Sequence, residues 1–314
     1  MFNLTIIFDS NYVEPALVTA LDLERFSPAD WDVTLIYIES QISDVNSEIF
    51  SLLGKYVNKK LKAISLKGEL FESFEKFHFT NSILYKLILP EIAHGNYIVN
   101  VDAGFLSGPN ISFLFEYCEF LVNSGGFSNS PIAAICSNAC DDLPLELRPY
   151  RHNAMYPFGW LLLFNTAQYK KMNFFSRVIS GYRFFKDKLV WAEQDLLCLI
   201  TNTHEITQLD LNEHVLIEQL SLQGYILGEN SRAWSSRFML YKITGTLKPW
   251  KRWVFDNKKQ FYLSRRNDLM SYRDLEKFQV IQNNWYEVTH QALYRAFLAA
   301  HEKESIRLCL DAHK

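Results

Sequence analysis

The amino-acid sequence predicts an α/β fold with a mostly parallel central sheet and flanking helices. Short apolar runs of strand length recur along the chain, and segments with a helical spacing of apolar residues lie between them. Such alternation is typical of a sheet whose strands run parallel. The chain has 314 residues, of which 48% are hydrophobic and 21% charged, enough for a large buried core. We expect a ligand site where the strands of this sheet end.

The predicted elements follow one another in a regular order. Helices are predicted over 13–26 and 82–92, where apolar residues recur at helical spacing. Strands are predicted over seven β-rich apolar runs, 4–8, 33–38, 61–66, 97–101, 132–136, 160–165 and 237–243.

The character of the sequence changes near Trp250. We therefore predict a catalytic or binding domain over 1–250 and a basic, aromatic and helical C-terminal extension over 251–314. Segment 248–273 contains eight basic and two acidic residues among six aromatic ones. This mixture favours either peripheral contact with an anionic membrane or a solvated basic face whose aromatic residues pack on the main domain. The stretch 285–313 is predicted to form one or two amphipathic helices.

Charge and cysteine content limit the partners and the compartment. The formal net charge of −3 gives no reason to expect a nucleic-acid partner. The N-terminus lacks a basic leader and resembles a core strand, and no apolar run is long enough to span a membrane. The five cysteines show no secreted disulfide spacing, which favours reduced core thiols. Cys136 and Cys140 with His152 lack an evident fourth zinc ligand. We expect a cytoplasmic protein, at most peripheral on the inner membrane face.

Polar residues follow several of the predicted strands. The first strand ends in Phe8-Asp9-Ser10-Asn11-Tyr12, and the strand over 97–101 ends in Asp102-Ala103-Gly104. An aromatic ring such as Tyr12 can stack on a base, while Asp9 and Asn11 can bond to base and ribose edges. Turn formation by Asx residues is the alternative explanation for Asp9 and Asn11.

Three further segments complete the pattern. They are Tyr85-Lys86-Leu87-Ile88-Leu89-Pro90-Glu91-Ile92, then Tyr156-Pro157-Phe158-Gly159-Trp160-Leu161-Leu162-Leu163-Phe164-Asn165 followed by Trp191-Ala192-Glu193-Gln194-Asp195-Leu196-Leu197, and finally Tyr241-Lys242-Ile243-Thr244-Gly245-Thr246-Leu247-Lys248-Pro249-Trp250. The sequence contains no phosphate-binding P-loop, dinucleotide fingerprint, zinc-protease or serine-hydrolase motif.

In this order, the five segments resemble glycosyltransferase family 8, which includes lipopolysaccharide galactosyl- and glucosyltransferases and glycogenin. The resemblance covers most of residues 1–250. It implies a GT-A nucleotide-diphospho-sugar transferase fold and transfer of a hexose from a UDP-sugar, with retention, to a glycan or lipid-linked glycan acceptor. An acceptor of lipopolysaccharide type is implied by analogy only.

The resemblance also implies roles for particular residues. Asp9, Asn11 and Tyr12 are expected to hold the nucleotide, Lys86 to lie near the donor in place of an arginine, and Gly245 and Lys248 to hold the diphosphate. Glu193, Gln194 and Asp195 are the catalytic candidates beneath the anomeric carbon, where carboxylate or amide oxygens stabilise an oxocarbenium-like state. The alternative for Glu193 and Asp195 is that acidic residues stabilise the first turn of a helix.

The metal motif of the family is incomplete in this chain. Asp102 occupies its first carboxylate position, but Gly104 replaces the second and Lys242 replaces the metal-binding histidine. A protonated lysine cannot ligate a metal, so a Mn²⁺ or Mg²⁺ site is doubtful and Asp102 is the one remaining ligand. We hypothesise that Lys242, with Lys248 and Lys86, neutralises the leaving diphosphate instead. One unit charge at about 4 Å contributes roughly 4 kcal/mol at an effective dielectric of about 20.

Two other interpretations remain open from the sequence. The chain is alternatively a catalytically inactive protein that binds a nucleotide-sugar or a glycan. Phe158 and Trp160 also stand where the family has polar and small residues, which suggests an altered sugar pocket and a different donor.

Overall fold

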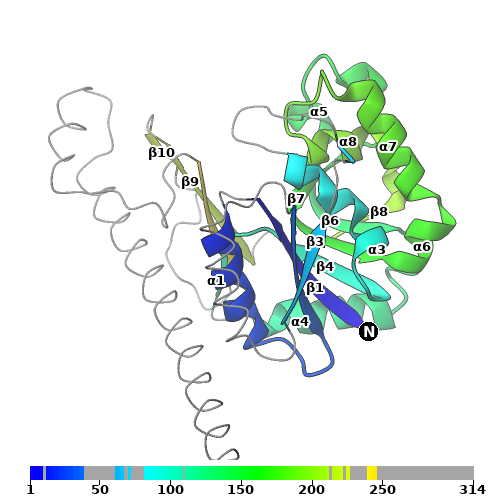
Figure 1. Cartoon of the computed structure of the whole chain (residues 1–314). Coiled ribbons are helices and arrows are strands. Elements are labelled where there is room, and N and C mark those ends of the chain that lie inside the picture. Colours follow the sequence, from blue (N-terminus) through cyan, green and yellow to red (C-terminus); the bar gives the residue numbers. More distant parts are fainter. Residues whose placement is uncertain are drawn as a thin grey trace, which may run out of the picture.

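The computed structural model describes residues 1–9, 12–38, 61–66, 70–71, 81–108, 110–211, 214–221, 224–226 and 239–245. It confirms the predicted α/β architecture, in which a central sheet carries helices on both faces (Figure 1). The proposed domain boundary near residue 250 and the extension over 251–314 lie outside the described residues.

The central sheet has seven strands in the order β3-β2-β1-β4-β7-β6-β8. Strands β1 to β4 run parallel, β7 is antiparallel to both neighbours, and β6 and β8 are parallel to each other. The sheet is therefore mostly parallel, as predicted. Its strands are β1 (Phe2–Phe8), β2 (Asp32–Ile38), β3 (Leu61–Leu66), β4 (Tyr97–Val101), β6 (Ile132–Asn138), β7 (Met155–Asn165) and β8 (Ile206–Gln208).

A second, four-stranded sheet lies beside the central one (Figure 1). Its order is β10 (Gly224–Ile226), β9 (Val215–Ser221), β11 (Leu240–Gly245) and β5 (Phe105–Ser107). The strand predicted over 237–243 is β11, which starts at Leu240 and belongs to this sheet instead of the central one. Strand β5 begins three residues after Asp102, so this sheet continues directly from the end of β4.

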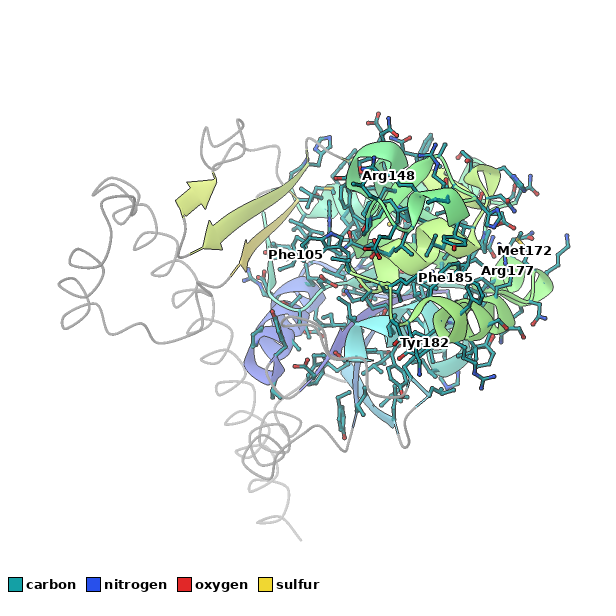
Figure 2. The ribbon with its side chains drawn as sticks, turned by 90° about the horizontal axis from the view of Figure 1, so that it is seen from above. Phe105, Arg148, Met172, Arg177, Tyr182 and Phe185 are labelled. Atoms are coloured by element: carbon teal, nitrogen blue, oxygen red, sulfur yellow. The ribbon has the colours of Figure 1, made fainter. Side chains whose placement is uncertain are left out.

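The central sheet separates the hydrophobic core into two layers, and helices cover both. Helices α1 (Val13–Glu24) and α4 (Ser112–Asn123) cover one face of the central sheet and bury Trp31 between them and the strands. The other face carries the 3₁₀ helix η2 (Asn81–Ile88) and helices α3 (Leu89–Ile92), α5 (Ala139–Asp142), α6 (Thr166–Lys171), α7 (Phe174–Phe185) and α8 (Glu193–Ile200). In Figure 2, Phe105 lies on the side of the small sheet, whereas Met172 and Arg177 lie at the opposite edge.

The helix predicted over 82–92 needs a correction, because most of it is 3₁₀. Residues 81–88 form η2, and only Leu89–Ile92 are α-helical. Pro90 stands just after the change, in the first turn of α3, where a residue without an N–H leaves no helical hydrogen bond unmade.

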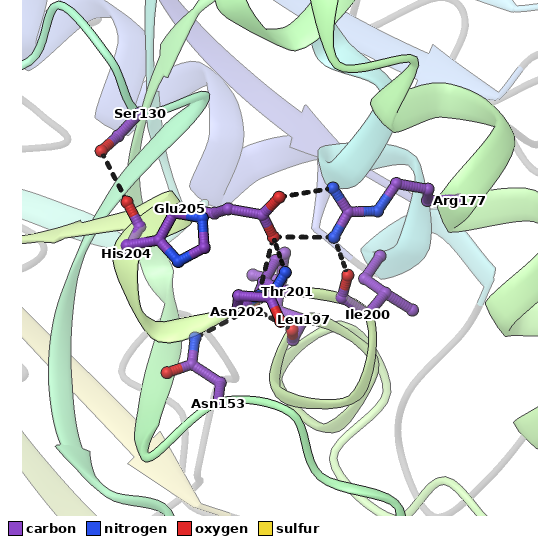
Figure 3. Close-up of polar contacts among 9 residues, drawn as sticks. All are labelled: Ser130, Asn153, Arg177, Leu197, Ile200, Thr201, Asn202, His204 and Glu205. Carbon is purple, nitrogen blue, oxygen red and sulfur yellow. Dashed lines mark hydrogen bonds and ion pairs between the residues drawn. The ribbon is translucent and has the colours of Figure 1, made fainter.

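An ion-pair network fixes the C-terminal end of α8 (Figure 3). The guanidinium of Arg177 on α7 donates to both carboxylate oxygens of Glu205, at 2.8 and 2.7 Å, and also to the carbonyl of Ile200. Glu205 additionally accepts from the backbone N–H of Asn202 at 2.7 Å. Burial alone would raise the pKa of Glu205, but the hydrogen bond from Arg177 lowers it below its usual value. These contacts tie the end of α8 to α7.

Candidate active site

Three charged residues meet where the central strands end, although they are far apart in the sequence. The ammonium of Lys86 on η2 forms an ion pair with Asp102, which follows β4, and a second one at 3.4 Å with Glu193, the first residue of α8. Lys86 also donates to the carbonyl of Gly159 on β7 at 3.4 Å. Lys86 and Glu193 are 4% and 1% exposed, whereas Asp102 is 17% exposed. Lys86, Asp102 and Glu193 are called the Lys86 cluster below.

Gly159 allows this cluster to form. A Cβ atom at position 159 would lie 2.0 Å from Oε1 of Glu193 and less than 3 Å from two carbons of the same side chain. Only a glycine leaves room for a buried glutamate against β7 at this point. The sequence shows Gly159, but only the packing of α8 on β7 reveals why a glycine is needed.

Burial and charge give the cluster unusual proton affinities. Burial raises the pKa of Glu193 to about 7, although Lys86 acts in the opposite direction. Burial alone would lower the pKa of Lys86, but Asp102 and Glu193 together raise it above its usual value. Lys86 is therefore a stable cation held between Asp102 and a carboxyl that titrates near neutrality. Oε2 of Glu193 is buried without a hydrogen-bond partner among the described residues.

Asp195 holds the turn that leads into α8. Its Oδ2 accepts from the backbone N–H groups of Val190 and Trp191, both at 2.7 Å, and its Oδ1 accepts from the hydroxyl of Tyr156 at 2.7 Å. Ala192, between this turn and Glu193, has a φ of +47°, a conformation that is costly for a residue with a Cβ. Asp195 is completely buried, and its bonds hold the backbone that precedes α8.

The expected nucleotide-binding residues at the end of β1 lie beside the cluster. Asp9 is buried and accepts from the hydroxyl of Ser82 on η2 at 3.5 Å. Burial, followed by the charges of Asp102 and Asp9, raises the pKa of Tyr12 above its usual range. The Tyr12 side chain, half-buried before α1, therefore lies near both carboxylates. Asn11 lies outside the described residues.

The turn after Asp102 requires Gly104, which the family resemblance predicts to stand at the second metal-ligand position. Gly104 has a φ of +92°, and its N–H donates to the hydroxyl of Thr19 on α1 at 2.9 Å. The same hydroxyl donates to the carbonyl of Phe105 at 2.8 Å. Helix α1 thus fixes the turn from β4 into β5. A carboxylate-bearing residue at position 104 would cost roughly 1–3 kcal/mol in backbone strain.

Strand β11 of the four-stranded sheet lies next to the turn that joins β4 to β5. Lys242 pairs with Phe105 of β5, so its backbone lies one residue beyond Gly104 in the register. Gly245 ends β11 and pairs with Leu220 of β9. Lys248, like the segment 248–273 as a whole, lies outside the described residues. The structure therefore brings Lys242 and Asp102 to the same turn by backbone register.

Two aromatic rings flank Gly159 on β7. Phe158 and Trp160 are stacked, with ring centroids 5.6 Å apart and planes inclined by 24°, and both are half-buried. Trp160 also lies 6.2 Å from the ring of Phe105. The β6–β7 pairing is irregular here, where β7 has additional residues between Leu162 and Pro157. The additional residues disrupt the regular β6–β7 ladder at the place where the two rings lie.

The remaining catalytic candidate, Gln194, is half-buried in the first turn of α8, between the buried Glu193 and Asp195. Among the described residues, no group of three or more His, Cys, Asp or Glu side chains is arranged to hold a metal ion. In the same part of the chain, no helix combines the length and the apolar character that a membrane span requires.

Comparison with solved structures identifies the fold. No protein-family model and no curated protein matches the chain. The galactosyltransferase LgtC, in complex with donor and acceptor sugar analogues, superimposes with a TM-score of 0.58 over 84% of this chain and 96% of LgtC, at 14% identity. The chain has the GT-A fold.

Two further structures support the same fold. The bifunctional glycosyltransferase WbbM matches with a TM-score of 0.53 at 15% identity, over 85% of this chain and 50% of WbbM. The glycosyltransferase GlyE of Streptococcus pneumoniae TIGR4 matches with a TM-score of 0.50 at 14% identity, over 91% of this chain and 63% of GlyE.

The GT-A fold of this chain contains two site features that sequence reasoning missed. Tyr156 anchors Asp195, and Gly159 makes room for Glu193. A lone glycine between two aromatic residues on a strand is a signal for close approach, and it was available in the sequence.

Proposed function

We propose that the protein is a glycosyltransferase that moves a hexose from a UDP-sugar, with retention, to a glycan or lipid-linked glycan. The observation that carries the proposal is the Lys86 cluster. Lys86, Asp102 and Glu193 come from three of the segments predicted to bind the donor, and they meet at the ends of the strands. The GT-A fold supports the same assignment, because ligands of open α/β sheets bind at this edge.

We propose further that transfer does not depend on a metal ion bound in the manner of the family. Asp102 is the only carboxylate among the three positions that correspond to metal ligands, and it is paired with Lys86. Gly104 is required by its positive φ, and Lys242 is a cation. The residues present therefore do not fit a dication bridging a diphosphate, and we derive no step through one.

Positive charge for the leaving diphosphate must then come from side chains. The charge of Lys86 is already balanced by Asp102 and Glu193, so we assign the diphosphate to Lys242 and Lys248. The register that places Lys242 next to the Asp102 turn supports this assignment. Lys86 serves instead to keep Asp102 ionised and oriented toward the donor.

The first turn of α8 is proposed to stabilise the reacting sugar. Gln194 is half-buried, whereas its two acidic neighbours are buried. We therefore assign the direct contact with the oxocarbenium-like state to the amide oxygen of Gln194, with the negative charge of Glu193 behind it. Asp195 acts as a positioning residue through the turn at Ala192.

The stacked pair of Phe158 and Trp160 is proposed to line the donor-sugar pocket. Aromatic faces contact the C–H groups of a sugar ring, whereas polar residues would bond to its hydroxyls. The donor is thus expected to present an apolar ring face toward β7, and a panel of UDP-sugars is the appropriate screen.

The deciding experiment measures UDP release and glycan transfer with this panel in excess EDTA and again with Mn²⁺. We expect turnover to persist in EDTA, and Lys86→Met to abolish it while Lys171→Met, on the exposed end of α6, leaves it unchanged. Loss of turnover in EDTA with recovery on Mn²⁺ would refute metal independence. If UDP raises the melting temperature but no donor in the panel is consumed, the competing interpretation of a catalytically inactive binding protein is favoured.

A further inference from the structure

A cluster of aromatic rings is exposed where α7 ends. Phe184 is 69% exposed and Tyr150, in the short 3₁₀ helix η3 (Arg148–Tyr150), is 41% exposed. The ring of Phe184 lies 6.5 Å from that of Tyr150 and 4.7 Å from that of Phe185, measured between centroids. Phe185 is buried and anchors the group to the core. Neighbouring aromatic rings that are largely exposed form an apolar surface patch, and such patches mark surfaces that bind a partner.

The surroundings of these rings are basic. The ammonium of Lys188 lies 4.9 Å from the centre of the Tyr150 ring. The segments 145–152 and 183–188 together carry five basic residues against two acidic ones, Glu146 and Asp187. The basic residues are Arg148, Arg151, Arg183, Lys186 and Lys188. Figure 2 labels Arg148 and Phe185, which mark the two segments that meet here. We call Tyr150, Phe184, Phe185 and Lys188, with the basic residues around them, the α7 patch.

We propose that the α7 patch is a docking surface for an anionic lipid bilayer. Phenylalanine and tyrosine rings insert at the level of the lipid headgroups, and lysine and arginine side chains extend to the phosphates. Each basic residue near an anionic surface strengthens binding roughly fivefold. An excess of positive charge around protruding aromatic rings fits this partner better than it fits an apolar protein surface.

The position of the patch relative to the active site strengthens the inference. The loop that leaves α7 passes Lys188 and reaches Glu193 of the Lys86 cluster within five residues. Trp191 on this loop is 45% exposed, and tryptophan is the residue that membrane interfaces favour most. A bilayer bound at the patch would therefore lie near the loop that enters α8, on the path of a lipid-linked acceptor. None of the patch residues belongs to the segment 248–273, for which membrane contact is predicted from sequence alone.

The test uses the full-length chain and vesicles, and it needs no enzymatic activity. Phosphatidylcholine vesicles with and without phosphatidylglycerol are floated on a density gradient with the wild type, Phe184→Glu and Lys188→Glu. We expect binding only to the anionic vesicles, and a loss of about tenfold or more in each variant. Both side chains are exposed, so the melting temperature of each variant should match that of the wild type.

Phe120→Glu supplies the matched control. Phe120 is 66% exposed on α4, on the opposite face of the sheet, where Glu116 and Glu119 are its neighbours in sequence. Its replacement should leave flotation unchanged. The proposal is overturned if Phe184→Glu binds vesicles as well as Phe120→Glu does, or if neutral and anionic vesicles bind equally. It is also overturned if sedimentation without lipid shows that Phe184→Glu dissociates an oligomer, since the patch would then be a protein interface.

Discussion

Replacing Glu193 by glutamine is expected to stabilise the folded protein above neutral pH and much less in mild acid. Glu193 is buried against Gly159, with Lys86 at 3.4 Å as its counter-ion and Asp102 close enough to repel it. Burial removes the water molecules that would hydrogen-bond to the carboxylate of Glu193, and among the described residues no donor replaces them at Oε2. The ionised form is therefore disfavoured in the folded protein. Glutamine keeps the shape and removes the ionisation.

The magnitude follows from the pKa of Glu193, which rises from 4.5 to about 7 on folding. A carboxyl with this change costs about 3 kcal/mol more to ionise in the folded than in the unfolded chain. Below pH 4.5 the group is neutral in both states, and the cost is absent. Between pH 4.5 and 7 the unfolded chain releases its proton first, so stability falls as pH rises. Above pH 7 the whole cost is present, and the Glu193→Gln variant avoids it.

Urea unfolding of the wild type and of Glu193→Gln at pH 5 and pH 8 measures this difference. We expect the variant to be more stable by less than about 1 kcal/mol at pH 5 and by up to about 3 kcal/mol at pH 8. Glu146→Gln, at an exposed glutamate on the surface, should show no such change between the two pH values. If the difference between wild type and Glu193→Gln is the same at both pH values, the burial argument is wrong.

Three further substitutions test the framework of the site. Gly159→Ala should destabilise the fold by about 1–3 kcal/mol, because its Cβ would collide with Glu193, and thermal unfolding in a Glu193→Ala background should show the loss largely relieved. Asp195→Asn should lower turnover more than it weakens UDP binding, measured by steady-state kinetics and calorimetry, because an amide cannot replace both oxygens that hold the turn before α8. Glu205→Gln should lower the free energy of unfolding by about 1–2 kcal/mol at pH 7, because the ion pair with Arg177 is lost. Urea unfolding should show this difference disappear as the pH falls through the lowered pKa of Glu205.

Strands such as β1 and β6 could be predicted because burial on both faces leaves a continuous apolar run in the sequence, whereas the three-residue β8, buried only at Ile206, was not predicted. Phe2–Phe8 is buried at every position, and Ile132 to Cys136 likewise. Strand β5 could not be predicted, since three residues carry too little periodicity to identify a strand. Its place in the second sheet depends on pairing with β11, more than 130 residues later.

The candidate site was predictable as a set of residues but not as a set of contacts. The order of the motifs predicted Lys86, Asp102 and Glu193 as site residues one by one. Nothing in the sequence indicated that the ammonium of Lys86 would bind both carboxylates. The pairing depends on the 3₁₀ geometry of η2 and on the space left at Gly159, which are properties of the folded chain. For the same reason, Asp195 looked like an equal partner of Glu193 until its three hydrogen bonds showed that it supports the turn.

The Lys86 cluster also bears on the metal ligands that the family resemblance leads us to expect. Lys86 provides the positive charge beside Asp102 that a bound metal ion would otherwise provide. Lys86 does not neutralise a leaving diphosphate as well, because its charge is already shared by Asp102 and by Glu193, whose pKa is about 7. Above neutral pH the cluster therefore has a net negative charge, which would repel the donor phosphates. Any metal-independent transfer at this site must draw its cation from elsewhere, and Lys242 is the candidate that the strand register brings to the same turn.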